Sequence, residues 1–231
     1  MMLRLLLCLV LALPTFAGEL EDAKKDFAKH DAEMKAVLTD LKKCLRARQL
    51  LMVEESQEHW WEARDGISNF QARDQDPETS VEKWQTAAWL TANRVAWLKA
   101  WKKIDERKGW AGDYMDAHGG SLQILEKDGK TYFYLEVVRG PTFHNGQIGG
   151  ELKIDGNKAS FETRAFEDSE LTKIMLSPLG DGSGRLKLDA ENTSYFHGAR
   201  ASFQGNYLWT GELDAKQKKL FEKQYKENFG E

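Results

Sequence analysis

The chain has 231 residues, a formal net charge of −4 and 41% hydrophobic residues. Its basic and acidic side chains are interspersed, which disfavours nucleic acid as a partner because phosphates require a basic face. A mildly acidic surface instead favours a cationic partner, attracted at long range by forces that salt screens.

Residues 1–17 have the features of a signal peptide. Arg4 precedes an apolar run that Pro14 ends, and residues 15–17 supply small side chains at the two recognition positions. We expect cleavage after Ala17 and a periplasmic or secreted mature protein. Removal of Arg4 would change the net charge from −4 to −5.

The two cysteines of the chain lead to separate predictions about lipidation and disulfide formation. A lipidated Cys8 is the alternative to cleavage, but Cys8 lies inside the apolar run without the small residues that precede such a cysteine. After cleavage Cys44 is the only thiol, so no intramolecular disulfide can form. We expect Cys44 to be a small core residue rather than a nucleophile. No later segment approaches the ~20 apolar residues of a membrane span.

Residues 18–108 are predicted to form an antiparallel helical domain. Residues 19–64 contain neither Gly nor Pro, and their apolar positions recur at intervals of three and four. A bend is expected near residues 46–49, and Asp76-Pro77 marks a break. Thr79 or Ser80 is a suitable N-cap for a further helix over residues 81–103. On it we expect three tryptophans to share one face: Trp89, Trp97 and Trp101.

Gln57, Trp60 and Arg64 are separated by three and then four residues, so on a helix they form one stripe. Arg64 is expected to stack on Trp60 or to pair with a carboxylate of a neighbouring helix. Because Arg64 and Asp65 are adjacent, no salt bridge between them is expected. The tryptophan-rich surroundings favour a structural role for the stripe, and a recognition surface is the alternative, since Trp and Arg are common interface anchors.

Three segments together resemble the LprI-type lysozyme-inhibitor domain, a small secreted bacterial helical module. They are the segment beginning at Asp31, the Gln57-x-x-Trp60-x-x-x-Arg64-Asp65 motif, and the Leu-Thr-x-x-Arg segment that ends at Arg94. The resemblance covers roughly residues 20–103, and the cysteine pair common in that family is absent. It implies inhibition of lysozyme by occlusion, with Gln57, Trp60, Arg64, Asp65 and Arg94 as candidate partner-binding residues.

Residues 109–212 change character, since glycines become frequent and alternation replaces the helical period. Short strands are predicted at residues 121–125, 132–139, 147–154, 158–164, 171–176, 185–188 and 199–208, with Gly-containing tight turns between several of them. This spacing predicts an antiparallel barrel or sandwich and an α+β chain. Residues 110–114 are echoed by residues 203–207, which suits first and last strands that pair to close a barrel. Ile148-Gly-Gly-Glu151 is expected to mark a bulge or bend.

Residues 213–231 are predicted to form a C-terminal helix. Asp214 is its expected cap, and Leu220, Phe221 and Tyr225 are expected to dock on the barrel or on the helices.

His144 and His197 occupy similar aromatic-His segments near predicted strand starts, so the barrel rim could bring them together around a ligand. Hydrogen bonding within their own loops is the favoured alternative. No histidine pair has metal-ligand spacing, and no acid, base and nucleophile can be assembled. We therefore expect no cofactor and no metal, and a binding protein rather than an enzyme.

The leading hypothesis is an exported envelope protein that binds lysozyme or another cell-wall hydrolase. The alternative is a periplasmic barrel that encloses a small ligand or glycan, with the helices as a scaffold. Its cavity would be lined by Phe133, Phe143, Phe161, Tyr195, Phe203 and Trp209.

Overall fold

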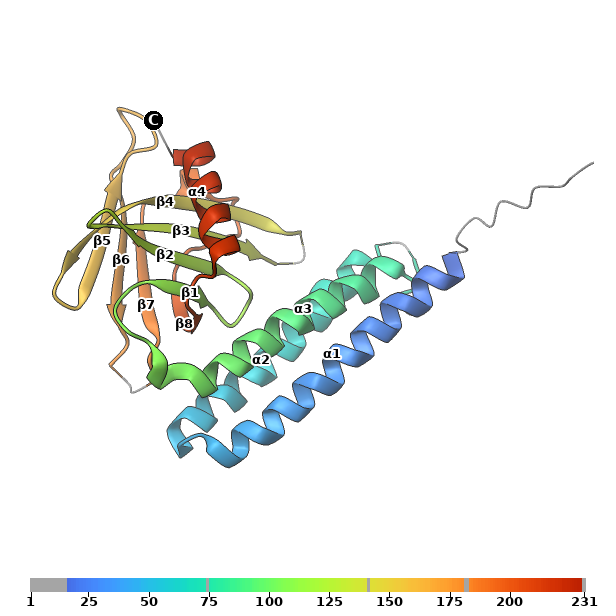
Figure 1. Ribbon diagram of the computed structural model, residues 1–231. Helices are drawn as coiled ribbons and strands as arrows, with labels where there is room; N and C mark the ends of the chain where they lie inside the picture. Colours follow the sequence, from blue (N-terminus) through green and yellow to red (C-terminus); the bar gives the residue numbers. More distant parts are fainter. Residues whose placement is uncertain (1–15, 74, 141, 181–182, 230–231) are drawn as a thin grey trace, which may run out of the picture.

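The computed structural model describes residues 16–73, 75–140, 142–180 and 183–229. A bundle of helices lies against one side of a β-barrel, and a further helix covers another part of the barrel (Figure 1). Most of the predicted signal peptide, residues 1–15, lies outside the described residues.

The helical part consists of α1 (Phe16–Cys44), α2 (Ala47–Gln71), α3 (Val81–Ala100) and the 3₁₀ helix η1 (Trp101–Glu106). The three long helices run antiparallel to their chain neighbours (Figure 1). The predicted bend is the break between α1 and α2. Ser80 is the N-cap of α3, and its side chain accepts a hydrogen bond from the backbone N–H of Lys83 over 3.2 Å.

Two expectations for the helical part are wrong. Trp89 is 47% exposed, whereas Trp97 and Trp101 are buried. The reason is the helical period, since eight and twelve residues rotate the side chain by about 80° and about 120° around the axis. Cys44 is also exposed rather than part of the core. Cys44 is the last residue of α1, at the edge of the bundle core, whereas Leu41 one turn earlier is fully buried in that core.

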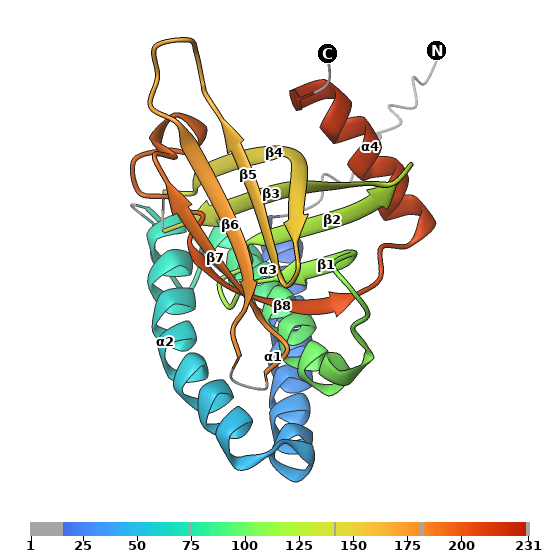
Figure 2. The same cartoon turned by 90° about the vertical axis from the view of Figure 1, so that its left-hand side faces the viewer.

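The barrel has eight antiparallel strands in sequence order, and β1 pairs with β8 to close it (Figure 2). The strands are β1 (Gly112–Met115), β2 (Ser121–Lys127), β3 (Lys130–Arg139), β4 (His144–Asp155), β5 (Lys158–Thr163), β6 (Thr172–Pro178), β7 (Leu186–Glu191) and β8 (Gly205–Gly211). The predicted α+β class is confirmed, and the sheet is a barrel rather than a sandwich.

One detail of the predicted barrel is wrong, and one prediction is narrowed. The last strand begins at Gly205, because the preceding residues form turns in which Ala201 N–H donates to Gly198 O and Gln204 N–H to Ser202 Oγ. Gly149 and Gly150 were expected to mark a bulge or a bend. They form no bulge, since β3 and β4 pair without a register shift, and β4 curves along its length (Figure 2). A Cβ on Gly150 would overlap the Phe161 ring, so close packing explains this glycine.

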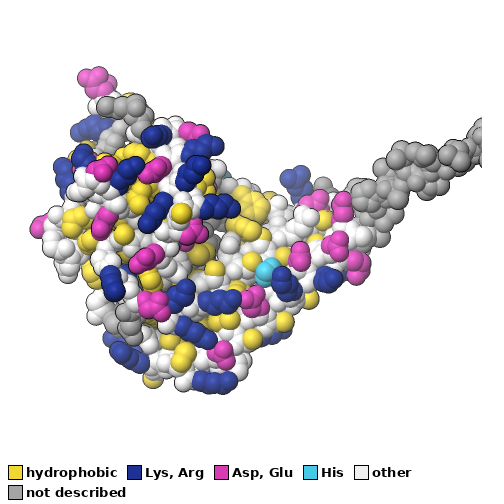
Figure 3. Space-filling model, in the orientation of Figure 1, with side chains coloured by type: hydrophobic (Ala, Val, Ile, Leu, Met, Phe, Trp, Pro, Cys, Tyr) yellow, Lys and Arg dark blue, Asp and Glu magenta, His cyan; other side chains and the backbone are white. Residues whose placement is uncertain are grey.

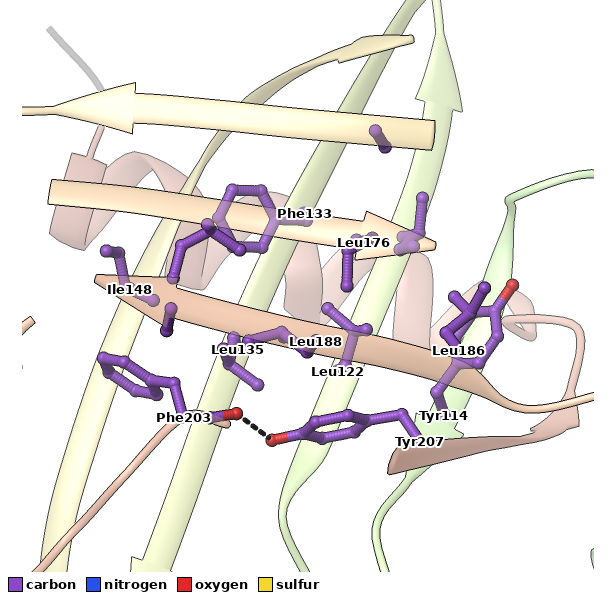
Figure 4. Packing of buried hydrophobic residues seen from close by; sticks show 14 of the residues in the cluster. Tyr114, Leu122, Phe133, Leu135, Ile148, Leu176, Leu186, Leu188, Phe203 and Tyr207 are labelled. Carbon is purple, nitrogen blue, oxygen red and sulfur yellow. Dashed lines mark hydrogen bonds between the residues drawn. The ribbon is translucent and has the colours of Figure 1, made fainter. Parts of the chain in front are cut away.

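The barrel interior is occupied by buried side chains from all eight strands and from the segment before β8 (Figure 4). Tyr114, Phe133, Phe203 and Tyr207 are its largest fully buried members, and the Tyr207 hydroxyl donates to Phe203 O over 3.1 Å. Trp209 is also buried there and Phe161 packs against the cluster, whereas Phe143 and Tyr195 are exposed. Side chains therefore fill the barrel interior, where the sequence predicted the lining of a ligand cavity.

Helix α4 (Ala215–Phe229) packs on the outside of the barrel. Its N-cap is Asp214, whose Oδ1 accepts from the backbone N–H of Gln217 over 2.7 Å. Phe221 is buried and Tyr225 packs edge-on against Tyr132, as expected. Leu220 was expected to dock and is exposed, because it precedes Phe221 on the helix and faces away from the barrel.

One strand joins the two parts of the chain. In β8, Tyr207 and Trp209 point into the barrel, and Leu208 between them is fully buried in the helical core. Met115 and Ala117 pack against the same core from the neighbouring strand and loop. The bundle and the barrel therefore share an apolar interface along β1 and β8.

Candidate functional site

The helical segments around Met34, Gln57 and Arg94 meet inside the helical bundle. Arg94 of α3 donates from Nε to Gln57 Oε1 of α2 over 2.9 Å, and Gln57 Nε2 donates to Met34 Sδ of α1 over 3.5 Å. Arg94 also donates to Ser56 Oγ over 2.9 Å and to Ala117 O over 3.4 Å. This network joins three helices to the β1–β2 loop.

Arg94 is 1% exposed and its guanidinium lies 4.2 Å from the Trp97 ring centroid. Burial lowers the pKa of Arg94 to about 9, so the group still carries its charge at neutral pH. Gln57 and Trp60 are buried as well. These three side chains are core residues of the bundle, and Trp60 also lines a pocket together with Arg64 and Leu90.

Arg64 combines several structural contacts. Its guanidinium lies 5.3 Å from the Trp60 centroid and 5.3 Å from the Phe27 centroid, and Nη1 is 3.5 Å from Asp31 Oδ1 of α1. It also pairs with Asp65, at 2.7 Å between Nη2 and Oδ1. The expectation that these neighbours do not pair is therefore wrong, because the long arginine stem lets the guanidinium reach the exposed Asp65 carboxylate.

The two rim histidine segments lie together. Gly146 forms a bridge with His197, and Gly198 N–H donates to Asn145 O over 2.9 Å. The His197 ring is held in its loop, with Nε2 3.0 Å from Thr193 Oγ1 and Nδ1 2.9 Å from Gly198 O. The barrel thus brings His144 and His197 to adjacent segments, and the His197 ring nitrogens serve loop structure.

Sequence reasoning missed a charged site where the β1–β2 loop meets the end of β3. Asp116 is buried and pairs with Arg139 Nη2, while its Oδ1 accepts from the backbone N–H groups of His118, over 2.9 Å, and Gly120, over 2.7 Å. The Asp-Ala-His-Gly-Gly segment at residues 116–120 is a signal for such a side-chain-stabilised turn. Nothing local predicts the arginine partner.

A second missed feature is the acidic loop, residues 164–171, between β5 and β6. Phe166 is 53% exposed and Tyr195 of the β7–β8 segment is 61% exposed, and their rings meet edge-on with centroids 5.1 Å apart. Three exposed carboxylates flank Phe166: Glu167, Asp168 and Glu170. The loop projects beyond the barrel end (Figure 2).

A third feature is a groove of about 480 Å³ between α3 and the β3–β4 turn. The exposed Trp89 and Phe143 line it together with Val138, and polar side chains complete the lining: Gln85, Thr86, Glu136 and Asn145. Hydrophobic side chains gather over this turn beside the helices (Figure 3).

Comparisons with protein-family models, curated proteins and solved structures gave no match. Within the described ranges, no group of three or more His, Cys, Asp or Glu side chains is placed to hold a metal ion. The described helices also include none with the length and apolar character to cross a membrane.

Proposed function

We propose that this chain is an exported binding protein that inhibits lysozyme, or another cell-wall hydrolase, by covering its active site with the acidic loop. The observation that carries the proposal is a hydrogen-bonded loop whose exposed Phe166 meets the exposed Tyr195 of the β7–β8 segment and is followed by three exposed carboxylates. The helical bundle acts as a scaffold, and catalysis by this chain is not part of the proposal.

The acidic loop is held in one shape by internal hydrogen bonds. Ser169 is buried, its Oγ donates to Phe166 O over 2.7 Å, and Phe166 N–H donates to Ser169 Oγ over 3.1 Å. Arg164 Nη1 donates to Ser169 O. A loop that is ordered before binding loses little conformational entropy in the complex, which favours affinity.

The charge of the loop suits a cationic partner. Lysozymes are commonly cationic with an acidic catalytic cleft. Glu167, Asp168 and Glu170 would attract the basic surface beside that cleft, while the Tyr195 hydroxyl supplies a donor for its carboxylates. Exposed Phe and Tyr rings are suitable anchors for the centre of such an interface.

The resemblance of residues 20–103 to the LprI-type domain supports lysozyme as the partner class. Because Gln57, Trp60 and Arg94 are buried, we assign these motif residues to the scaffold and not to the contact surface.

A lytic assay with the full mature chain and several lysozyme classes tests the proposal. We expect dose-dependent inhibition at micromolar concentration. Phe166→Ala and Tyr195→Ala should each weaken it by about 10- to 100-fold, the range of interface anchors. Phe70→Ala, an exposed phenylalanine at the far end of α2, is the matched control and should have no effect.

Charge is tested separately. The triple substitution of Glu167→Gln, Asp168→Asn and Glu170→Gln should slow association and reduce its dependence on salt between about 0.05 M and about 0.5 M. No inhibition of any lysozyme by the wild-type chain would overturn the proposal. Equal losses in Phe70→Ala and Phe166→Ala would overturn the role of the loop.

Glycan binding is the second candidate, and one observation favours it. Trp89 and Phe143 expose aromatic faces in a groove that also holds amide and carboxylate side chains, a combination suited to a sugar ring. Because side chains fill the barrel interior, the candidate glycan site is the groove and not the interior of the barrel.

Co-sedimentation with insoluble cell-wall glycan tests this candidate. Trp89→Ala should lower the bound fraction at least about tenfold, while Trp61→Ala, an exposed tryptophan of α2, should not change it. Retained binding by Trp89→Ala would exclude the groove as the glycan site.

A further inference from the structure

Helix α4 carries positive charge on an otherwise acidic chain. Its sequence contains five lysines and two glutamates, a net charge of +3, whereas the whole chain carries −4. All five lysines are exposed, and Lys and Arg side chains gather on the face of the molecule where α4 lies (Figure 3). The opposite face of the helix packs on the barrel through Phe221 and Tyr225.

Four of these lysines form one row along the exposed face of α4, which we call the lysine stripe. They are separated by three, four and three residues, a spacing that places side chains on the same side of a helix. The members of the stripe are Lys216, Lys219, Lys223 and Lys226. Because a helix rises about 1.5 Å per residue, the stripe is a straight row of positive charge about 15 Å long.

The lysine stripe differs from an ordinary solvated helix face, on which charges of both signs alternate, as they do along α1. Both glutamates of α4 are already engaged, Glu222 by Lys127 at 2.6 Å and Glu227 by Lys223 at 3.7 Å. The other three lysines of the stripe form no salt bridge with a described residue. Like charges three and four residues apart repel one another, and an anionic partner would relieve that repulsion.

An exposed apolar side chain accompanies the stripe. Leu220 faces away from the barrel and is 48% exposed. Lysines with an exposed leucine beside them are typical of helices that lie on a membrane surface, where the ammonium groups contact anionic headgroups and the apolar side chain enters the layer beneath them. A soluble polyanion offers no such apolar layer, so the combination favours a bilayer as the partner.

We propose that α4, docked on the barrel, binds the surface of a bilayer containing anionic phospholipid through the lysine stripe and Leu220. The apolar face of α4 stays buried against the barrel, so the chain lies on the bilayer and does not insert into it. The proposal does not rest on lysozyme inhibition. Helix α4 and the acidic loop occupy separate parts of the barrel surface (Figure 2), and failure of the lytic assay would leave the proposal unaffected.

Sedimentation of the full mature chain with lipid vesicles tests the proposal. The mature chain is used because the apolar run of the signal peptide would itself bind lipid. One vesicle preparation contains equal amounts of phosphatidylglycerol and phosphatidylcholine, and the other contains phosphatidylcholine alone. At about 0.05 M salt we expect the anionic vesicles to bind at least about tenfold more tightly, and at about 0.5 M salt we expect binding to be lost through screening.

A matched pair of double variants tests the stripe. Lys219→Gln with Lys223→Gln should weaken binding to the anionic vesicles by about 10- to 30-fold, the effect of two lysines near an anionic surface. Lys25→Gln with Lys29→Gln removes the same charge at the same spacing from exposed positions of α1, and should change binding by less than about twofold. Thermal unfolding verifies that both variants are folded.

A second matched pair tests the apolar contact. Leu220→Ala should weaken binding by about two- to fivefold, because less apolar surface enters the bilayer. Leu51→Ala removes a leucine of α2 that is 55% exposed and should have no effect. Equal binding by these two variants would exclude Leu220 from the contact.

Three results would overturn the proposal. They are no binding to the anionic vesicles at low salt, equal binding to both vesicle preparations, and equal weakening by the two double lysine variants. Soluble polyphosphate that binds as tightly, per phosphate, as the anionic vesicles would show that the stripe recognises charge alone, and would overturn the bilayer as its partner.

Discussion

Arg94 and Gln57 form a buried hydrogen bond of 2.9 Å between α3 and α2, and the same guanidinium reaches Ala117 O beside the barrel. A single side chain thus ties the bundle together and holds it against the β1–β2 loop.

Replacement of Arg94 by Met should therefore be strongly destabilising. The substitution keeps an apolar stem and leaves the Gln57 and Ser56 oxygens without their donor. We expect the free energy of unfolding to fall by about 2–4 kcal/mol, the cost of unpaired buried polar groups. Urea denaturation measures it. Arg48→Met, at an exposed position of α2, should change stability by less than about 0.5 kcal/mol; similar losses in both variants would contradict the assigned role of Arg94.

Two glycines should respond to alanine in opposite directions. Gly66 lies inside α2 and a Cβ there meets no atom within 4 Å, so Gly66→Ala should raise the free energy of unfolding by about 0.5–1 kcal/mol. At Gly150 a Cβ would overlap the Phe161 ring, so Gly150→Ala should lower it by about 1–3 kcal/mol. Thermal and urea unfolding of both variants check the two signs; a stabilising Gly150→Ala would show that Phe161 moves freely.

Asp113 should make stability depend on pH in an uncommon direction for a carboxylate. Burial raises its pKa above the ordinary 3.8, against the opposing hydrogen bonds from Thr210 and Gln123. The folded state then binds the proton more tightly than the unfolded chain, so this group's contribution to stability falls as pH rises from 3.8 to the raised pKa. Asp113→Asn removes the titration.

The difference in unfolding free energy between Asp113→Asn and the wild type should therefore shift in favour of the variant as the pH rises above 3.8, and then stay constant once the pH exceeds the raised pKa of Asp113. Urea titrations across this range measure it. A difference that is the same at every pH would contradict the raised pKa.

Helix α4 should depend on one side chain for its docking. Phe221 is buried against the barrel with Leu125, Tyr134 and Leu213. Phe221→Ala should free α4 and increase amide hydrogen exchange along it by about 100-fold or more, with the barrel strands still protected. Leu220→Ala removes an exposed neighbour and is the control. Unchanged exchange in Phe221→Ala would show that the other α4 contacts suffice.

The helices and the barrel could be predicted because their signals are local. The absence of Gly and Pro from residues 19–64, the Ser80 cap and the Gly-containing turns each act within a few residues. Barrel closure followed from the similarity of residues 110–114 and 203–207, and β1 indeed pairs with β8.

The candidate sites depend on how the parts pack, and local pattern does not encode that. Asp116 and Arg139 are 23 residues apart, and Arg185 donates to Met52 Sδ across 133 residues of sequence. The first pair joins the β1–β2 loop to the end of β3, and the second forms only when α2 docks on the barrel. For the motif residues, the spacing from Gln57 to Arg64 predicts that they share one helix face. It does not predict whether other helices bury that face. Here α1 and α3 cover it.

The position of Leu208 limits how this chain can be divided into separately expressed parts. It belongs to a barrel strand by hydrogen bonding and to the helical core by packing. A barrel expressed without the bundle would expose an apolar stripe to water, formed by Leu208, Met115 and Ala117. This stripe would favour self-association. The isolated bundle would lack a wall of its own core. Substitutions that probe the acidic loop or the groove should therefore be made in the intact chain, where unfolding of one half is expected to unfold the other.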